Sequence, residues 1–299
     1  MRRLLILLLA AAGFASPVVA GLPTWPAGLT VYRLKQGANG YTGWSDTFIN
    51  SSAGDSGKNF GGDDTLFVSP GAWTGTWHPG RSKILHKADL SQILPDNFVI
   101  ALAREYWYEA QGGSGTATSD TAGVHRVFFP WAEGAGTGTA SSSAATWTTA
   151  TDSTQWTSPG CSSVNSNNYG WSWTSIDSTV GSAFSGADTA DVNAAVNDMQ
   201  AQPLALFRPK NSATEPGRRG WVTFDWTHQA QLWQLGANTN NGVVIQSHNS
   251  NNNKQWGLIS SEHPDTTYRP YLMIYGFAVT QDTVTVTLGG DVPLGLGPN

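Results

Sequence analysis

The stretch GWVTFDWTHQAQLWQLGANTNNGVVIQSHN, residues 220–249, decides the fold class. Apolar and polar residues alternate over residues 222–226 with the period of two that a half-buried β-strand requires, and Val243 and Ile245 fall on one face of a second period-two pattern. Between the two runs the sequence predicts a short helical turn, for which Thr227 can serve as the N-cap and Gly236 as the stop. The stretch therefore predicts a strand, a helical turn and a second strand, and it has the character of scaffold.

The composition extends this prediction to the whole chain. The 299 residues include 34 Gly and 14 Trp, and only 12% are charged. Short runs of β-branched and aromatic residues lie between Gly, Ser and Asn clusters, a pattern typical of all-β proteins. We expect an antiparallel β-sandwich of jelly-roll type with long loops and one or two short helices. Besides the turn after Thr227, a helix is predicted over residues 189–199, with Met199 on its apolar face.

The first 20 residues have the layout of a secretory signal peptide. Two arginines precede an apolar run, and small residues lead to a cleavage position before Gly21. An uncleaved N-terminal anchor is the alternative. Loss of the two arginines leaves 14 basic against 21 acidic residues, a net charge of −7. Because the basic residues are scattered, a nucleic-acid partner is not expected. The sequence thus predicts a secreted protein, extracellular or at the cell surface, with no membrane span after removal of the signal.

The rest of the chain divides by composition. Residues 21–40 are a lead-in rich in Pro and Gly, residues 41–277 are the predicted sandwich, and residues 278–299 hold a C-terminal strand and a Pro/Gly tail. Within the sandwich, residues 161–220 form a long decorated connection with a strand near Leu204 to Phe207. The alternating strand at residues 280–288 can close a sheet edge or pair with a neighbouring chain, which makes self-association possible.

Five sequence motifs, taken in order, resemble those of the DNRLRE-domain family, a group of secreted β-sandwiches. They are SDTFINSS with NFGGDDTLFV, RSKILHKADLSQI, HRVFFPWAEG with AATW, VTFDWTHQAQLW with NNGVVIQS, and SSEHPDTTYRPYLMIYG, and they cover about residues 41–277. The family is also grouped with carbohydrate-binding modules. The resemblance implies a noncatalytic module of the kind often attached to surface or polysaccharide-active proteins.

Aromatic residues in loops are the candidate ligand contacts. Sugars stack their C–H faces on Trp and Tyr rings, and neighbouring amides bind the hydroxyls. Two loop groups fit this chemistry: Tyr169, Trp171 and Trp173 in NSNNYGWSWTS, and Trp73 and Trp77 in PGAWTGTWHPG. The alternative is that these rings pack on the sandwich, as we expect for Trp131, Trp147 and Trp156.

No catalytic motif is visible. Glu105 and Glu109 share one strand face with Trp107 between them, but four strand steps separate them by about 13 Å, beyond the roughly 5–10 Å that a glycosidase pair needs. They are interpreted as surface carboxylates. The six histidines are spread singly and are interpreted as solvated loop residues, although His248 and His263 could converge if their strands pair.

Three further assignments concern polar residues. Asp63 and Asp64, near Asp46 or Asp55, could supply hard oxygen ligands to a structural calcium ion, and the alternative is that they only form turns. Polar anchors of the fold are expected at four positions: Asp89, Asp225, Glu262 and Arg269. Cys161 is the single cysteine, which excludes an intrachain disulfide, and it is expected in a surface loop.

The sequence therefore predicts a secreted, noncatalytic protein that binds a polysaccharide through exposed aromatic rings, with no cofactor required. Two alternatives stay open. The chain could be a structural or adhesive surface protein, or it could be a polysaccharide-active enzyme whose carboxylates come from different strands.

Overall fold

The computed structural model of the protein describes residues 29–71, 74–75, 78–114, 121–162, 198–200, 203–207, 209, 220–248 and 255–279, without the side chains of residues 111–114. The larger of its two main sheets has six antiparallel strands in the order β1-β13-β6-β12-β4, with β10 also paired to β6. Their bounds are β1 (Thr30–Leu34), β13 (Tyr271–Ala278), β6 (Phe98–Ser114), β12 (Gln255–Ile259), β4 (Thr65–Val68) and β10 (Trp221–Asp225). The strand β1 lies inside the predicted lead-in.

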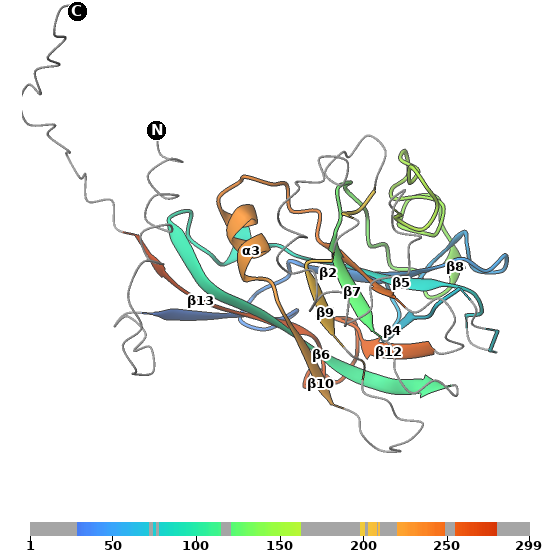
Figure 1. Cartoon of the computed structure of the whole chain (residues 1–299), viewed down its shortest axis with the longest axis horizontal. Helices are drawn as coiled ribbons and strands as arrows, with labels where there is room; N and C mark the ends of the chain where they lie inside the picture. The colour runs from blue at the N-terminus through green and yellow to red at the C-terminus, as the bar shows by residue number, and fades with distance from the viewer. Residues whose placement is uncertain are drawn as a thin grey trace, which may run out of the picture.

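The smaller main sheet has five antiparallel strands in the order β2-β5-β11-β7-β9. Their bounds are β2 (Trp44–Asn50), β5 (Ser82–Ala88), β11 (Val243–Ser247), β7 (Ala122–Arg126) and β9 (Ala205–Phe207). The remaining described elements are the two-stranded pair β3 (Lys58–Asn59) and β8 (Thr139–Ala140), the 3₁₀ turn η1 (Leu90–Gln92) and the helix α3 (Thr227–Gln234). Figure 1 shows the long strand β6 running beside β13 along the molecule.

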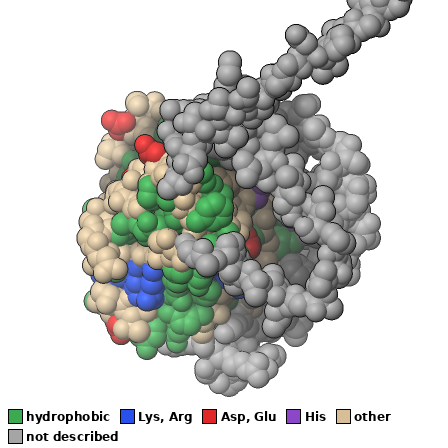
Figure 2. All heavy atoms as spheres, turned by 90° about the vertical axis from the view of Figure 1, so that its left-hand side faces the viewer, with side chains coloured by type: hydrophobic (Ala, Val, Ile, Leu, Met, Phe, Trp, Pro, Cys, Tyr) green, Lys and Arg blue, Asp and Glu red, His purple; other side chains and the backbone are tan. Residues whose placement is uncertain are grey.

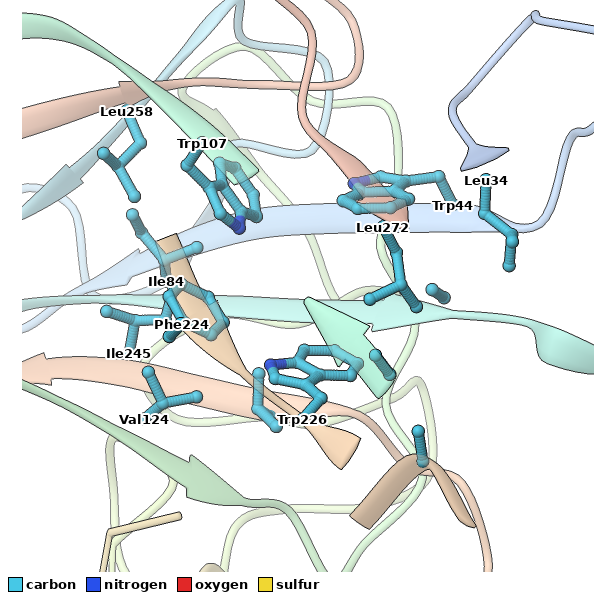
Figure 3. Packing of buried hydrophobic residues seen from close by; sticks show 14 of the residues in the cluster. Leu34, Trp44, Ile84, Trp107, Val124, Phe224, Trp226, Ile245, Leu258 and Leu272 are labelled. Atoms are coloured by element: carbon cyan, nitrogen blue, oxygen red, sulfur yellow. The ribbon is translucent and has the colours of Figure 1, made fainter. Parts of the chain in front are cut away.

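The two main sheets pack face to face around one core, which confirms the predicted all-β sandwich. Inward side chains of both sheets meet there: Trp107 and Leu272 come from the six-stranded sheet, and Ile84 and Ile245 come from the five-stranded sheet. Figure 3 shows these side chains between the strands. Burial of this apolar surface provides the main driving force for folding. The lone cysteine allows no intrachain disulfide that could add to it.

Residues 220–249 form the predicted strand, helix and strand, and they connect the two layers. The strand β10 pairs with β6 in the six-stranded sheet, whereas β11 lies between β5 and β7 in the five-stranded sheet. The expected capping role of Thr227 was wrong: Trp226 is the N-cap residue. The Thr227 Oγ1 instead accepts the Ala103 backbone N–H at 3.0 Å, which attaches α3 to β6.

The outer face of the five-stranded sheet is covered by a second apolar cluster. Its members come from the sheet, from the segment after β7 and from residue 199: Ile49, Leu85, Val127, Trp131, Ala145, Ala150, Trp156, Cys161, Met199 and Val244. The expected packing of Trp131 and Trp156 is confirmed, and Trp147 packs against the same cluster while partly buried. A surface position for Cys161 was wrong, because its side chain is fully buried.

Two predicted elements lie in the connection over residues 161–220. The strand expected near Leu204 to Phe207 is present as β9. The helix predicted over residues 189–199 lies largely outside the described residues, and at its end Met199 makes a β-bridge to Val127 instead of a helical turn. In the described part of the chain, none of the helical segments has the length and apolar character that a membrane crossing requires.

Candidate functional site

The aromatic ligand contacts expected from the sequence lie outside the described residues: Trp73, Trp77, Tyr169, Trp171 and Trp173. The structure describes a different group of aromatic side chains, on the solvent side of the six-stranded sheet. We call it the aromatic face and define it as Tyr106, Tyr108, Trp221, Tyr268 and Tyr271.

Strand alternation produces the aromatic face. In β6 the inward positions include Glu105, Trp107 and Glu109, all fully buried. Tyr106 and Tyr108 occupy the positions between them, so they point to the opposite side of the sheet. The same alternation in β13 sends Leu272 into the core and leaves the neighbouring Tyr271 half-buried on the outside.

The rings of the aromatic face contact one another across three strands. Tyr271 lies opposite Tyr106 in the sheet register, and the two rings stack with centroids 4.7 Å apart and planes 10° from parallel. Tyr108 meets Trp221 at 5.4 Å between centroids and Tyr268 at 4.6 Å. Trp221 and Tyr271 are 5.1 Å apart, which closes the group. Each ring of the group is therefore packed against at least one neighbouring ring in the absence of a ligand.

The aromatic face is open to solvent. Tyr268 is exposed, with a relative accessibility of 37%, and the other four rings are half-buried. Two strand residues beside the rings, Thr223 and Asp225, are exposed and polar. An open sheet surface with clustered rings and polar neighbours can receive a flat apolar ligand face and also hydrogen-bond its edges.

Cations gather at one side of the aromatic face. The Arg33 guanidinium carbon lies 4.1 Å from the Tyr271 ring centroid, and the Lys35 Nζ lies 5.8 Å from it. Burial, and then the charges of Arg33 and Arg269, hold the pKa of Lys35 below its usual value, while Asp265 opposes this shift. The contact made by the exposed Arg33 contributes about 0.5–1 kcal/mol.

The expected polar anchors lie at the surface and bind mainly backbone groups. Asp89 caps η1 by accepting the Ser91 N–H at 3.0 Å, and Asp225 accepts the Thr227 N–H at 2.8 Å. The Arg269 Nε donates to the His263 carbonyl at 2.7 Å. Glu262 is exposed, and its Oε1 accepts the Ser261 hydroxyl at 3.3 Å.

The acids assigned to calcium make hydrogen bonds within the protein. Asp46 lies buried in β2, where its Oδ2 accepts the Trp44 indole N–H at 2.9 Å and the Ser261 N–H at 2.9 Å. Burial raises the pKa of Asp46 to about 6. The backbone carbonyl of Asp63 accepts the Ser260 hydroxyl, and the Asp64 side chain accepts the Thr65 hydroxyl. Within the described ranges, no group of three or more His, Cys, Asp or Glu residues is arranged to hold a metal ion.

The interpretation of Glu105 and Glu109 as surface carboxylates was wrong, because both are fully buried between the sheets. The Glu105 Oε1 lies 2.7 Å from the His86 Nε2 and accepts the Trp107 indole N–H at 2.7 Å. Burial raises the pKa of Glu105, and the neighbouring His86 opposes that shift. Since inward-facing side chains pack around this pair, we interpret it as a polar link within the core.

The interpretation of all histidines as solvated loop residues was also wrong. His86, His125 and His248 are buried, and His125 and His248 meet on the outer side of the five-stranded sheet with their Nε2 atoms 2.8 Å apart. The His125 Nδ1 lies 2.9 Å from the Gln200 carbonyl, so the neutral ring donates there and accepts at Nε2 from His248. A Cβ at Gly123 would overlap the His248 ring, so only glycine leaves room for this pair. The convergence of His248 and His263 that strand pairing would have produced does not occur, because β11 and β12 lie in different sheets.

A scan against models of known protein families finds no match for the chain. A search of curated proteins finds no significant match either.

Proposed function

We propose that the protein is secreted and binds a polysaccharide without catalysis, through the aromatic face. The observation that carries the proposal is the cluster of five mutually packed rings on an open sheet surface. A buried core does not require aromatic side chains at these outward positions. Large apolar groups that gather on an exposed sheet face are typical of interaction sites.

The chemistry of sugars fits such a surface. A pyranose ring presents C–H groups on one face and hydroxyls around its edge, so aromatic rings can contact the face while polar side chains bind the edge. The exposed Tyr268 and the half-buried Trp221 offer ring surface, and Thr223 and Asp225 lie beside them for hydroxyl groups. A ring cluster that is already ordered loses little conformational entropy on binding, which favours affinity.

The aromatic face provides the same kind of ring surface that the sequence predicts for the loop groups. The resemblance to the DNRLRE-domain family and the predicted signal peptide support the same function, and both remain predictions. The loop groups around Trp73 and Trp171 stay candidates for additional contacts.

The test compares binding of the wild-type protein and a Trp221→Ala, Tyr268→Ala double variant to a panel of polysaccharides by glycan array and affinity electrophoresis. We expect the double variant to lose binding by about tenfold or more, since one aromatic stacking contact contributes about 1 kcal/mol or more. The matched control is Phe277→Ala. Phe277 is 39% exposed on the same sheet, but six strand steps, about 20 Å, separate it from Tyr271.

Wild-type protein that binds no glycan, or a double variant that binds as well as wild type, would contradict the proposal. Release of reducing ends from a bound glycan would instead favour the enzymatic alternative.

A further inference from the structure

The strand β1 leaves one edge of the six-stranded sheet open. It pairs with β13 on one side only, and among the described residues no strand pairs with its other edge. The inward ring of Tyr32 is only partly buried there, although it packs against the core and meets Phe98 edge to face at 5.3 Å. The core is therefore incompletely covered where the sheet ends. An open edge presents free N–H and C=O groups that another strand can pair with.

Exposed apolar side chains concentrate at the same place. Val31 on β1 is 49% exposed, and Phe277 and Val279, at and just beyond the end of β13, are 39% and 43% exposed. These are three of the four large hydrophobic residues that are exposed in the described part of the chain. Figure 2 shows hydrophobic side chains covering much of the described surface on the side that faces left in Figure 1. Clustered apolar surface of this kind is typical of a protein interface.

The chain itself supplies a segment with the matching pattern. Directly after Val279 the sequence TQDTVTVTLGG places Val284, Val286 and Leu288 on one side and threonines on the other. Paired with β1, this run would place its apolar side chains beside Tyr32 and extend the core. The lead-in before β1 is a poor occupant of the edge, because Pro23 and Pro26 lack the N–H that a strand ladder needs.

Chain length decides which copy can place this run against β1 as an antiparallel strand. An antiparallel partner on the open edge of β1 would run in the same direction as β13. Because Leu34, the last residue of β1, pairs with Leu272, that partner would begin beside Leu34, level with Leu272 and about 23 Å back along β13 from Val279. The four residues from Val279 to Thr283 span at most about 14 Å. Within one chain the run could therefore lie only parallel to β1, an arrangement that is rare in antiparallel sheets. A second copy has no such limit.

We infer that residues 283–288 of a second copy of the protein pair with the open edge of β1 as an added antiparallel strand. The donated run follows closely after β13 in the sequence, and β13 ends beside the start of β1, the strand that would accept it. Reciprocal exchange between two copies gives a closed dimer, and one-way donation gives larger assemblies. The inference does not depend on the carbohydrate-binding proposal, because it uses another part of the sheet.

The test measures the mass of the full chain by light scattering after size-exclusion chromatography, over a range of micromolar concentrations. We expect wild type to associate. Val286→Pro removes a ladder N–H in the middle of the run and should weaken association by about tenfold or more. Val292→Pro is the matched control, since it makes the same change in the same tail outside the run. Val31→Glu places a charge at the acceptor edge and should weaken association as well.

Wild-type protein that stays monomeric throughout the range would overturn the inference. So would association that Val286→Pro and Val31→Glu leave unchanged, because the interface would then lie elsewhere. Thermal melting of each variant checks that the fold is retained, and Val31 is an exposed residue outside the buried core.

Discussion

Replacing Glu133 by Gln should stabilise the fold at neutral pH and leave it unchanged in acid. The Glu133 side chain is half-buried, and its Oε1 accepts the Asp46 backbone N–H at 2.6 Å. Burial, followed by the charges of Asp46 and Glu262, raises the pKa of Glu133 from 4.5 to about 8. The folded protein therefore favours the protonated form, whereas the unfolded chain ionises freely above its lower pKa.

The magnitude follows from linkage. An acid whose pKa is raised by folding contributes no penalty below its unfolded pKa, and the penalty grows as the pH rises toward the folded value. Between pH 4.5 and 7 the unfolded state gains about 1.4 kcal/mol per pH unit relative to the folded state, so ionisation of Glu133 costs the fold roughly 3 kcal/mol at pH 7. Gln has nearly the same shape, keeps an oxygen that can accept the Asp46 N–H, and cannot ionise.

The assay is urea unfolding of wild type and Glu133→Gln at pH 4 and pH 7, with thermal melting as a second measurement. We expect no difference at pH 4 and a gain of roughly 3 kcal/mol at pH 7, or about 5 to 10 °C in Tm. Asp152→Asn, at an exposed position, is the control and should change neither value. A variant that is less stable than wild type at pH 7, or one that gains equally at both pH values, would refute the reasoning.

Three further outcomes are expected. Burial lowers the pKa of His248 from 6.5 to about 4, so His248 destabilises the fold as the pH falls through that window. The difference in unfolding free energy between wild type and His248→Gln, measured by urea unfolding, should therefore change by about 3 kcal/mol between pH 7 and pH 4. Gly242→Ala should cost about 2 kcal/mol or more in the same assay, because Gly242 has a φ of 76° and a Cβ there would overlap the His86 carbonyl oxygen. Burial raises the pKa of the Cys161 thiol, so a thiol reagent should label it only after unfolding, and rapid labelling of the native protein would contradict its buried position.

The sequence was sufficient to predict the fold class but not the partners of the strands. Alternation and the Gly-marked turn in residues 220–249 specify a strand, a helix and a strand, because these are local patterns. They contain no information on register, and β10 and β11 prove to lie in opposite sheets. The burial of β11 on both faces follows from the second apolar cluster, whose members come from distant segments.

The aromatic face was missed because the phase of β6 is ambiguous in the sequence. The run EYWYE carries aromatic rings at both phases of a period-two pattern, so either side could have faced the core. Placing Trp107 inside takes Glu105 and Glu109 with it and turns Tyr106 and Tyr108 outward. The sequence feature that could have identified the aromatic face is the pair Tyr106 and Tyr108 on either side of Trp107. The alternation of RPYLMIY in β13 supports it, because Tyr271 points outward as they do.

The two main sheets differ in how their outer sides are covered, and this difference points to the face that can bind. The outer side of the five-stranded sheet is closed by the second apolar cluster and by the buried pair of His125 and His248. The outer side of the six-stranded sheet keeps the ring cluster of β6, β10 and β13 in contact with solvent. Clustering large aromatic side chains on an open sheet gains contact energy among the rings but leaves apolar area in water. A ligand that covers this area recovers the remaining hydrophobic free energy, and the rigid sheet beneath it needs no rearrangement to receive that ligand.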